Sequence, residues 1–218
     1  MKKTLTLLLF TVFVFCVSVF SFAGNRSGNK LVFGPVISGI EETGIVTREK
    51  AASGNHEEIP FSIDVSNISL RKMGNYDYIA IKGLKGLKTS TGEPNVPVKI
   101  FKLTFSRDTE IKGVEVTDIQ YRPFFTPLLI APTPKPIKMS KIKKMGVSPM
   151  KPDKEIYSSS KFFPEKIVTY YTGCDRKYRY VYVRFYPLQC IPRSKYSQII
   201  VSAVIKVYYE GEIVKENR

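Results

Sequence analysis

The segment SQIIVSAVIKVYYE, residues 197–210, places apolar side chains at successive alternate positions. These positions are Ile199, Val201, Ala203, Ile205 and Val207. Successive side chains of a strand point to opposite faces, so all five would share one face. A face without polar groups is stable only when it is covered. We therefore predict that this segment is a strand whose apolar face lies in the core of a β-sheet protein.

Six further runs of strand type precede this segment, separated by turn-forming residues. They are FSIDVSNISL, YDYIAIKGL, VPVKIFKLTF, IKGVEVTDIQY, KIVTYY and YRYVYVRFY. No sustained helical period competes with them. Their number and spacing predict an all-β fold, an antiparallel β-sandwich of jelly-roll-like form with a long Pro/Lys-rich loop. The expected sandwich domain spans residues 60–212. A flexible segment, 24–59, with LVFGPVISGI as its one possible strand, precedes it, and a tail, 213–218, follows.

The N-terminus has the organisation of a cleavable signal peptide. Two lysines precede a long apolar run, and Ser21-Phe22-Ala23 offers small residues at the positions that signal peptidase reads. We expect a signal peptide at 1–23 and a secreted or cell-envelope protein with no stable membrane anchor after cleavage. The alternative is an uncleaved anchor, for which the apolar run is near the lower length limit. Removal of 23 of the 218 residues leaves 195, enough for one domain with its own core.

The expected mature chain is strongly basic. Without the two lysines of the signal peptide it keeps 32 Lys and Arg residues against 19 acidic ones, a net charge of about +13. A surface of this charge favours an acidic partner. Nucleic acid is not expected as that partner, because an exported chain seldom meets it and no nucleic-acid-binding motif appears.

The two cysteines of the expected mature chain, Cys174 and Cys190, flank the predicted strand at 178–186. An extended strand of this length holds its ends about 25–30 Å apart. A disulfide requires the two Cα atoms to lie within about 7 Å of each other. We therefore expect two separate thiols.

No combination of residues resembles a catalytic or metal site. The single histidine, His56, lies in the polar stretch SGNHEE, which we expect in a mobile tail. One histidine and two distant cysteines suit neither a Cys/His dyad nor a zinc site. We expect a binding domain with no metal, no cofactor and no enzymatic activity.

One long segment breaks the strand pattern. Residues 123–155 contain seven prolines, which exclude a continuous helix or a central strand. From residue 133 to residue 154 there are seven lysines and a single acid, Asp153. We expect an extended loop, and long loops in compact domains are commonly functional. The alternative is a merely solvated, charged loop.

One further pattern concerns the aromatic residues of a predicted strand. The predicted strand at 178–186 has Tyr178, Tyr180, Tyr182, Arg184 and Tyr186 on one face. Such a stripe could stack on a sugar or peptide, but aromatic side chains also pack well on a sheet, and we favour packing.

The phrase STGEPNVPV, residues 90–98, contains no acid, base or nucleophile suited to catalysis, yet it is conformationally restricted. Gly92 can adopt a positive φ, and Pro94 and Pro97 hold φ near −65°. The phrase predicts a kink that sets the direction of the strand that follows.

Five motifs follow one another along the chain. They are GEPNVPV, LLIAP at 128–132, IYSSSKFFPEKIV at 156–168, VRFYPLQCIP at 183–192, and the closing strand. In this order they resemble the N-terminal propeptide of gingipain-type (C25 family) cysteine peptidases. There the corresponding pieces look like G-x-P-x-L-P, L-I-A-P, Y-x-x-x-x-F-F-P, a P-x-Q-Y-N-P turn and a final amphipathic strand. The resemblance covers roughly residues 60–210, and Cys190 departs from it by replacing an aromatic residue of the turn.

The resemblance implies a β-sandwich that assists folding of the peptidase, keeps it latent during export and lays a loop across the active-site cleft. The matching loop follows LLIAP, and MSKIKK places Lys141 nearest to the family's blocking residue. The other expected members of this peptidase-binding loop are Lys138, Lys143 and Lys144. A lysine suits a specificity pocket with an acidic floor, because the two charges pair there.

The implied partner is the catalytic domain of a cysteine peptidase. We expect an inhibitor and folding assistant without a catalytic domain of its own. It is either a separately encoded protein that acts in trans or the remnant of a truncated gene. The alternative function is a β-sandwich surface adhesion or binding module.

Overall fold

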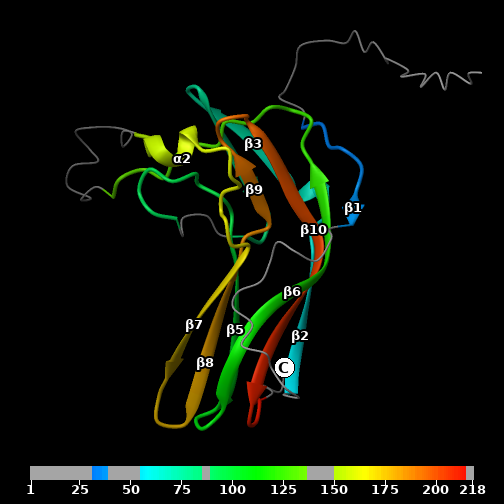
Figure 1. Ribbon diagram of the computed structural model, residues 1–218, viewed down its shortest axis with the longest axis vertical. Helices are drawn as coiled ribbons and strands as arrows, with labels where there is room; N and C mark the ends of the chain where they lie inside the picture. The colour runs from blue at the N-terminus through cyan, green and yellow to red at the C-terminus, as the bar shows by residue number, and fades with distance from the viewer. Residues whose placement is uncertain (1–30, 39–54, 85–88, 137–149, 215–218) are drawn as a thin grey trace, which may run out of the picture.

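The computed structural model describes residues 31–38, 55–84, 89–136 and 150–214 (Figure 1). Within these ranges the structure is dominated by strands, and the helical elements are a 3-10 turn, η1 (Val65–Asn67), and α2 (Lys154–Ser158). The predicted signal peptide, residues 1–23, lies outside the described residues. No helix in the described part of the chain is long and apolar enough to cross a membrane.

Two sheets form the body of the molecule, and a hairpin lies at one end. The larger sheet has the order β1-β6-β10-β2, with β9 also pairing to β10, and the smaller has the order β5-β8-β7. The larger sheet consists of β1 (Ile37–Ser38), β2 (Asn55–Ser62), β6 (Glu110–Pro123), β9 (Leu188–Ile191) and β10 (Tyr196–Glu210). The smaller consists of β5 (Lys99–Ser106), β7 (Val168–Cys174) and β8 (Tyr178–Phe185), and the hairpin of β3 (Ile68–Met73) and β4 (Tyr76–Ile81). All pairings between these strands are antiparallel, so the predicted all-β antiparallel sandwich is confirmed.

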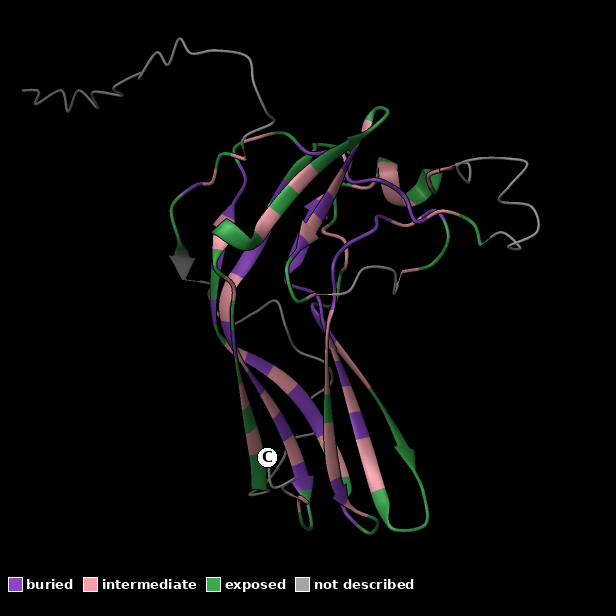
Figure 2. Cartoon of the chain, turned by 180° about the vertical axis from the view of Figure 1, so that it is seen from behind, coloured by how far each residue is buried: buried purple, intermediate pink, exposed green. Residues whose placement is uncertain are grey.

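The two sheets face each other across a first apolar cluster, which we call the inter-sheet core. Phe105 of β5, Phe185 of β8 and Ile205 of β10 are completely buried in it. Figure 2 shows the alternation that produces this core, with buried and partly exposed residues following one another along the strands. The rings of Phe61 and Phe185 meet edge to face with their centroids 4.7 Å apart, which joins β2 to β8.

A second apolar cluster, which we call the hairpin core, involves the β3–β4 hairpin. It combines Ile79 and Ile81 of β4 with residues from coil segments and from the larger sheet. Segments between the strands contribute Val96, Val98, Phe124, Leu128, Ile130 and Tyr186. The larger sheet contributes Leu188 and Cys190 of β9 and Ile199 of β10. Because coil segments supply much of this cluster, their backbone groups must find hydrogen-bond partners outside regular sheets.

β10 contributes to both cores. Ala203, Ile205 and Val207 lie in the inter-sheet core, whereas Ile199 lies in the hairpin core and Val201 packs against it. The pairing with β6 shifts register after Ile200. A bulge of this kind changes which face the following side chains occupy. The predicted apolar face is therefore covered, but by two different cores.

Most of β2 lies where the sequence indicated no strand. The predicted run FSIDVSNISL begins only at Phe61, and η1 divides it between the end of β2 and the start of β3. β2 pairs with β10 from Asn55, opposite Tyr209, to Ser62, opposite Ser202. The prediction that His56 sits in a mobile tail is therefore wrong. In the first half of β2, His56 and Glu58 are polar and exposed, because one face of an antiparallel sheet can be solvated. No apolar residue precedes Ile59 in this strand, and this polarity concealed the strand pattern.

The chain continues as an extended segment after β10. The Ser106 N–H donates to the carbonyl of Glu212 (2.9 Å), and the Val214 N–H donates to the carbonyl of Thr104 (2.9 Å). Residues 212–214 therefore run alongside β5, although the sequence predicted a tail from 213 onward. The buried Thr109 hydroxyl donates to the Glu212 carbonyl (3.0 Å) and accepts from its N–H (3.0 Å), which fastens this segment.

Candidate functional site

Residues 90–95 form a tight turn that we call the clamp. The Glu93 N–H donates to the carbonyl of Ser90 (3.1 Å), and Gly92 between them has φ of +90°. A type II turn requires a positive φ at this position, and glycine adopts it without steric cost. The Glu93 carboxylate also accepts from the Ser90 N–H at 2.6 Å, which closes the turn from the side-chain end. The sequence STGEPN is thus conformationally suited to one compact turn.

The clamp holds the end of the LLIAP segment that leads into the lysine-rich stretch. The Thr133 N–H donates to the carbonyl of Glu93 (2.7 Å), and the Gly92 N–H donates to the carbonyl of Thr133 (2.9 Å). Two residues before Thr133, the carbonyl of Ala131 accepts from the Asn95 N–H (2.8 Å). These three bonds fix the chain up to residue 133, and only residues 134–136 separate it from the undescribed segment 137–149.

The same turn holds the other end of that segment. The Asp153 N–H donates to the carbonyl of Gly92 at 3.0 Å. A Cβ atom at position 92 would lie 3.2 Å from both the Asp153 nitrogen and the Lys151 oxygen, so the two backbones touch where glycine leaves space. The Asp153 carboxylate then accepts from the N–H groups of Glu155 (2.9 Å) and Ile156 (3.2 Å) and caps α2. Gly92 therefore contacts both flanks of the undescribed segment.

Asp77 anchors LLIAP from the opposite side. It is 2 % exposed, its N–H donates to the Leu129 carbonyl (2.7 Å), and its carboxylate accepts from the Leu129 N–H (2.9 Å). The Ala131 N–H donates to the Asp77 carbonyl (2.8 Å), and the Lys72 ammonium lies 2.6 Å from the second carboxylate oxygen. A buried carboxylate paired in this way is costly to disturb, because loss of a partner leaves a desolvated charge.

Tyr157 links α2 to the same segment. Its hydroxyl donates to the Ile130 carbonyl at 2.6 Å. Burial raises the pKa of Tyr157, so this hydroxyl keeps its proton and remains a donor across the physiological range. The chain before the undescribed segment and the helix after it are thus joined by a side chain as well as by the clamp.

The four lysines predicted to bind a peptidase, Lys138, Lys141, Lys143 and Lys144, all lie outside the described residues. What the structure describes is the support on either side of them. Sequence reasoning did not identify Gly92, Asp77 or Tyr157 as parts of this support. The signal available was STGEPNVPV, whose restricted backbone was interpreted only as a kink before β5. The loop predicted to reach residue 155 ends slightly earlier, because α2 begins at Lys154.

The cysteines and the histidine lie on separate elements. Cys174 ends β7 and is exposed, Cys190 is buried in β9, and neither forms a disulfide, as predicted. Burial raises the pKa of the Cys190 thiol to about 12, so that thiol is not a nucleophile at neutral pH. The recorded contacts of His56 are with Glu58 and Tyr208, and no group of metal-binding side chains occurs in the described ranges.

Comparison with known proteins agrees with the architecture. The family model Propeptide_C25 matches residues 60–213. One similar solved structure is the complex of the pro- and mature domains of RgpB from Porphyromonas gingivalis, with 22% identity and a TM-score of 0.61 over 78% of this chain and 87% of the matched chain. Another concerns zymogenic latency of gingipain K from the same organism, with 16% identity and a TM-score of 0.60 over 81% of this chain and 98% of the matched chain. No curated protein sequence matches the chain. The family match covers most of the sequence, and the chain belongs to the Propeptide_C25 family, whose members are propeptides of gingipain-type cysteine peptidases.

Proposed function

We propose that this chain is an exported propeptide that binds the catalytic domain of a gingipain-type cysteine peptidase, inhibits it and assists its folding. In this proposal residues 138–144, centred on Lys141, contact the active site. Lys141 occupies an acidic specificity pocket, with Lys138, Lys143 and Lys144 around it. The chain acts outside the cytoplasm, after removal of residues 1–23.

The observation that carries the proposal is the pair of backbone hydrogen bonds at Gly92. One leads to Thr133 and the other comes from Asp153, so the flanks of the lysine-rich segment are held side by side. Binding costs less conformational entropy when the ends of a loop are fixed beforehand. A loop held in this way would present its lysines from a defined base.

Charge supports the same assignment. A lysine that enters a pocket loses its hydration, and an acidic group in that pocket compensates for the loss. A site that recognises basic side chains must contain such a group. The surplus of about 13 positive charges on the expected mature chain would also favour association with an acidic surface.

Single alanine substitutions in the lysine-rich segment test the proposal. Loss of one partner of a buried charge pair costs about 2–5 kcal/mol. Lys141→Ala should therefore weaken inhibition about 30-fold or more, since each tenfold change in affinity corresponds to about 1.4 kcal/mol. Inhibition constants of the mature chain should be measured against the mature domain of RgpB and against gingipain K, together with Lys138→Ala, Lys143→Ala and Lys144→Ala.

Lys166→Ala is the matched control, because Lys166 is exposed and lies outside the segment. It should change inhibition less than about threefold, the size expected for an exposed charge. Equally small effects of all four loop substitutions would exclude this loop from the mechanism. If a neighbouring lysine rather than Lys141 produced the large effect, the blocking residue would be reassigned within the loop.

A further inference from the structure

The outer surface of the β5-β8-β7 sheet carries a group of residues that we call the tyrosine face. It consists of Lys102, Tyr171, Tyr178, Tyr180, Tyr182 and Arg184. On β8 these side chains alternate with Val181, Val183 and Phe185, which are buried in the inter-sheet core, so the tyrosine face points away from that core. Tyr171 is 45% exposed and Tyr178 is 37% exposed.

The aromatic rings of this face are packed against each other and against the two cations. Tyr171 and Tyr182 are stacked, with centroids 4.9 Å apart and planes 9° from parallel. The Arg184 guanidinium carbon lies 4.7 Å from the centroid of Tyr171, and the Lys102 ammonium lies 4.3 Å from the centroid of Tyr180. Packing was predicted for this stripe, and the contacts confirm that its rings pack.

Carboxylates are missing from the strands that build the tyrosine face. β5, β7 and β8 contain no Asp or Glu. The nearby turn has one acid, Asp175, which accepts from the Tyr180 hydroxyl (2.6 Å) and from the N–H groups of Lys177 (2.9 Å) and Tyr178 (2.7 Å). These bonds hold Asp175 within its own hairpin, and Lys102 interacts with its carboxylate electrostatically without forming an ion pair.

The two cations have unused capacity. No ion pair involving Lys102 or Arg184 is found among the described residues. The Nε of Arg184 is buried and has no hydrogen-bond partner there. A buried polar group without a partner is costly, so this guanidinium is not fully satisfied within the described chain.

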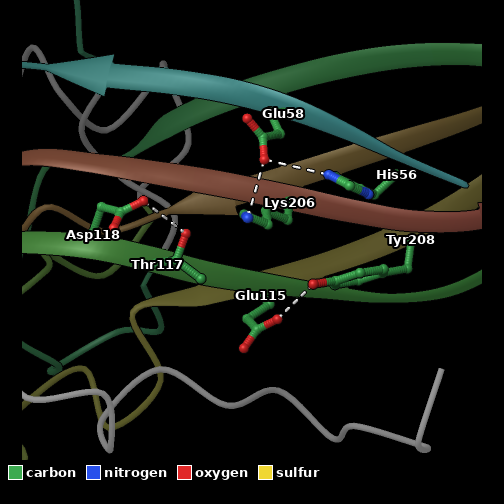
Figure 3. Close-up of polar contacts among 7 residues, drawn as sticks. All are labelled: His56, Glu58, Glu115, Thr117, Asp118, Lys206 and Tyr208. Carbon is green, nitrogen blue, oxygen red and sulfur yellow. Dashed lines mark hydrogen bonds and ion pairs between the residues drawn. The ribbon is translucent and has the colours of Figure 1, made fainter. Parts of the chain in front are cut away.

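The larger sheet is different, as Figure 3 shows for part of it. Lys206 pairs with Glu58 (3.0 Å), and Lys112 pairs with Glu110 (2.8 Å) and Glu210 (3.2 Å). Lys112 and Lys206 are thus paired with carboxylates of the same sheet. Lys102 and Arg184 of the tyrosine face form no such ion pair within the described ranges.

We propose that the tyrosine face binds an acidic protein surface, with Lys102 and Arg184 contacting its carboxylates and the hydroxyls of Tyr171, Tyr178 and Tyr182 donating beside them. Because the rings of Tyr171 and Tyr180 already pack against neighbours, the face offers hydroxyls and cations more than open rings on which a sugar would stack. The inference rests on the proposed function only for the identity of the partner, which would be the peptidase catalytic domain. The contact would be additional to the one made by the lysine-rich segment.

Poly-L-glutamate is a direct probe of this face. To remove the contribution of the lysine-rich segment, all variants are made in a background in which Lys138, Lys141, Lys143 and Lys144 are replaced by alanine. Binding is measured by calorimetry at about 20 mM and about 150 mM NaCl, because contacts of this kind are screened by salt. Lys102→Gln/Arg184→Gln should weaken binding about tenfold, the size of two partly exposed ion pairs.

Lys112→Gln/Lys206→Gln removes the same charge from the other sheet and is the matched control. It should weaken binding less than about threefold, because those lysines are already paired. If the double variant fails to fold, the single variant Lys102→Gln replaces it, because Lys102 is exposed. This single variant should weaken binding about threefold. Equal losses from both sheets, or no saturable binding by the background protein at low salt, would overturn the inference.

The two proposals fail independently. If the four alanine substitutions leave inhibition of the peptidases unchanged while the tyrosine face still binds poly-L-glutamate selectively, the proposed function fails and the binding face stands. If inhibition depends on Lys141 while the two double variants bind equally, the face fails and the proposed function stands.

Discussion

The inter-sheet core and the clamp hold the chain together by different means. In the core, long strands pair along their whole length, as β10 does with β6 from Gln198 to Glu210, and alternate side chains are buried between the sheets. In the clamp, single hydrogen bonds join coil segments about 40 to 60 residues apart, and glycine permits their close approach. Regular strand pairing therefore builds the two sheets. Conformationally restricted coil, in contrast, supports the lysine-rich segment that is proposed to bind the peptidase.

The two regions are nevertheless connected. Val96 and Val98, which follow the clamp, are buried in the hairpin core, and Ile199 of β10 belongs to the same cluster. We therefore expect substitutions in the inter-sheet core to affect the whole molecule. Substitutions in the clamp should affect mainly the segments that it joins, because proteins open locally where few long pairings hold them.

Phe185→Ala should have the largest effect. Its ring is completely buried and contacts Phe61, so truncation should lower the free energy of unfolding by about 3–5 kcal/mol. Chemical denaturation monitored by circular dichroism measures this change. Phe125→Ala is the matched control, since Phe125 is 63% exposed and should change stability by less than about 0.5 kcal/mol. Similar losses from both substitutions would contradict the assignment of the core.

Gly92→Ala should have an intermediate effect concentrated at the clamp. The positive φ disfavours any Cβ by about 1–2 kcal/mol, and the added atom meets the Asp153 and Lys151 backbones. Hydrogen exchange should become faster at the amides of Thr133 and Asp153, while strand amides of β8 stay protected.

Gly74→Ala separates the two causes. Gly74 also has a positive φ, +62°, but a Cβ there meets no atom within 4 Å. It should carry the backbone strain without accelerating exchange at Thr133 or Asp153. If both variants accelerated exchange equally at those amides, the close approach at Gly92 would not be what holds the flanks.

Asp175→Asn should have the smallest effect, and one that depends on pH. The hydrogen bond from Tyr180, and then those from the Tyr178 and Lys177 backbone, hold the pKa of Asp175 below its ordinary 3.8. A lowered pKa in the folded state stabilises the protein above pH 3.8, and this contribution is lost as pH falls through the folded value. The difference in melting temperature between wild type and variant should therefore be present at neutral pH and disappear in strong acid.

The partner tyrosine provides a second measurement. The hydrogen bond to Asp175 raises the pKa of Tyr180 to about 12. Because the neutral amide of Asn removes the charge that opposes ionisation, Tyr180 should ionise at lower pH in the variant, and absorbance at 295 nm follows this. Tyr180→Phe is the control that removes the high-pH transition. An unchanged tyrosine titration in Asp175→Asn would show that the carboxylate is not the cause.

Much of the fold could be predicted because it depends on local alternation. Val181, Val183 and Phe185 alternate with polar or aromatic residues in β8, and most alternate positions of β10 are apolar. This pattern arises directly from the geometry of a half-buried strand. The separation of Cys174 from Cys190 followed from strand length alone and is confirmed. β2 was missed because an edge strand with exposed His56 and Glu58 lacks that pattern over its first half.

The support of the proposed site could not be predicted in the same way. The composition of STGEPNVPV determined a restricted turn, and the prolines of residues 123–136 determined an extended coil. Only the tertiary structure decided that Thr133 and Asp153 both meet Gly92, and that a bulge after Ile200 sends the two halves of one apolar face into different cores. Local sequence biases φ, ψ and side-chain direction. A hydrogen bond between distant coil segments depends instead on how the packing of the sheets brings those segments together in space.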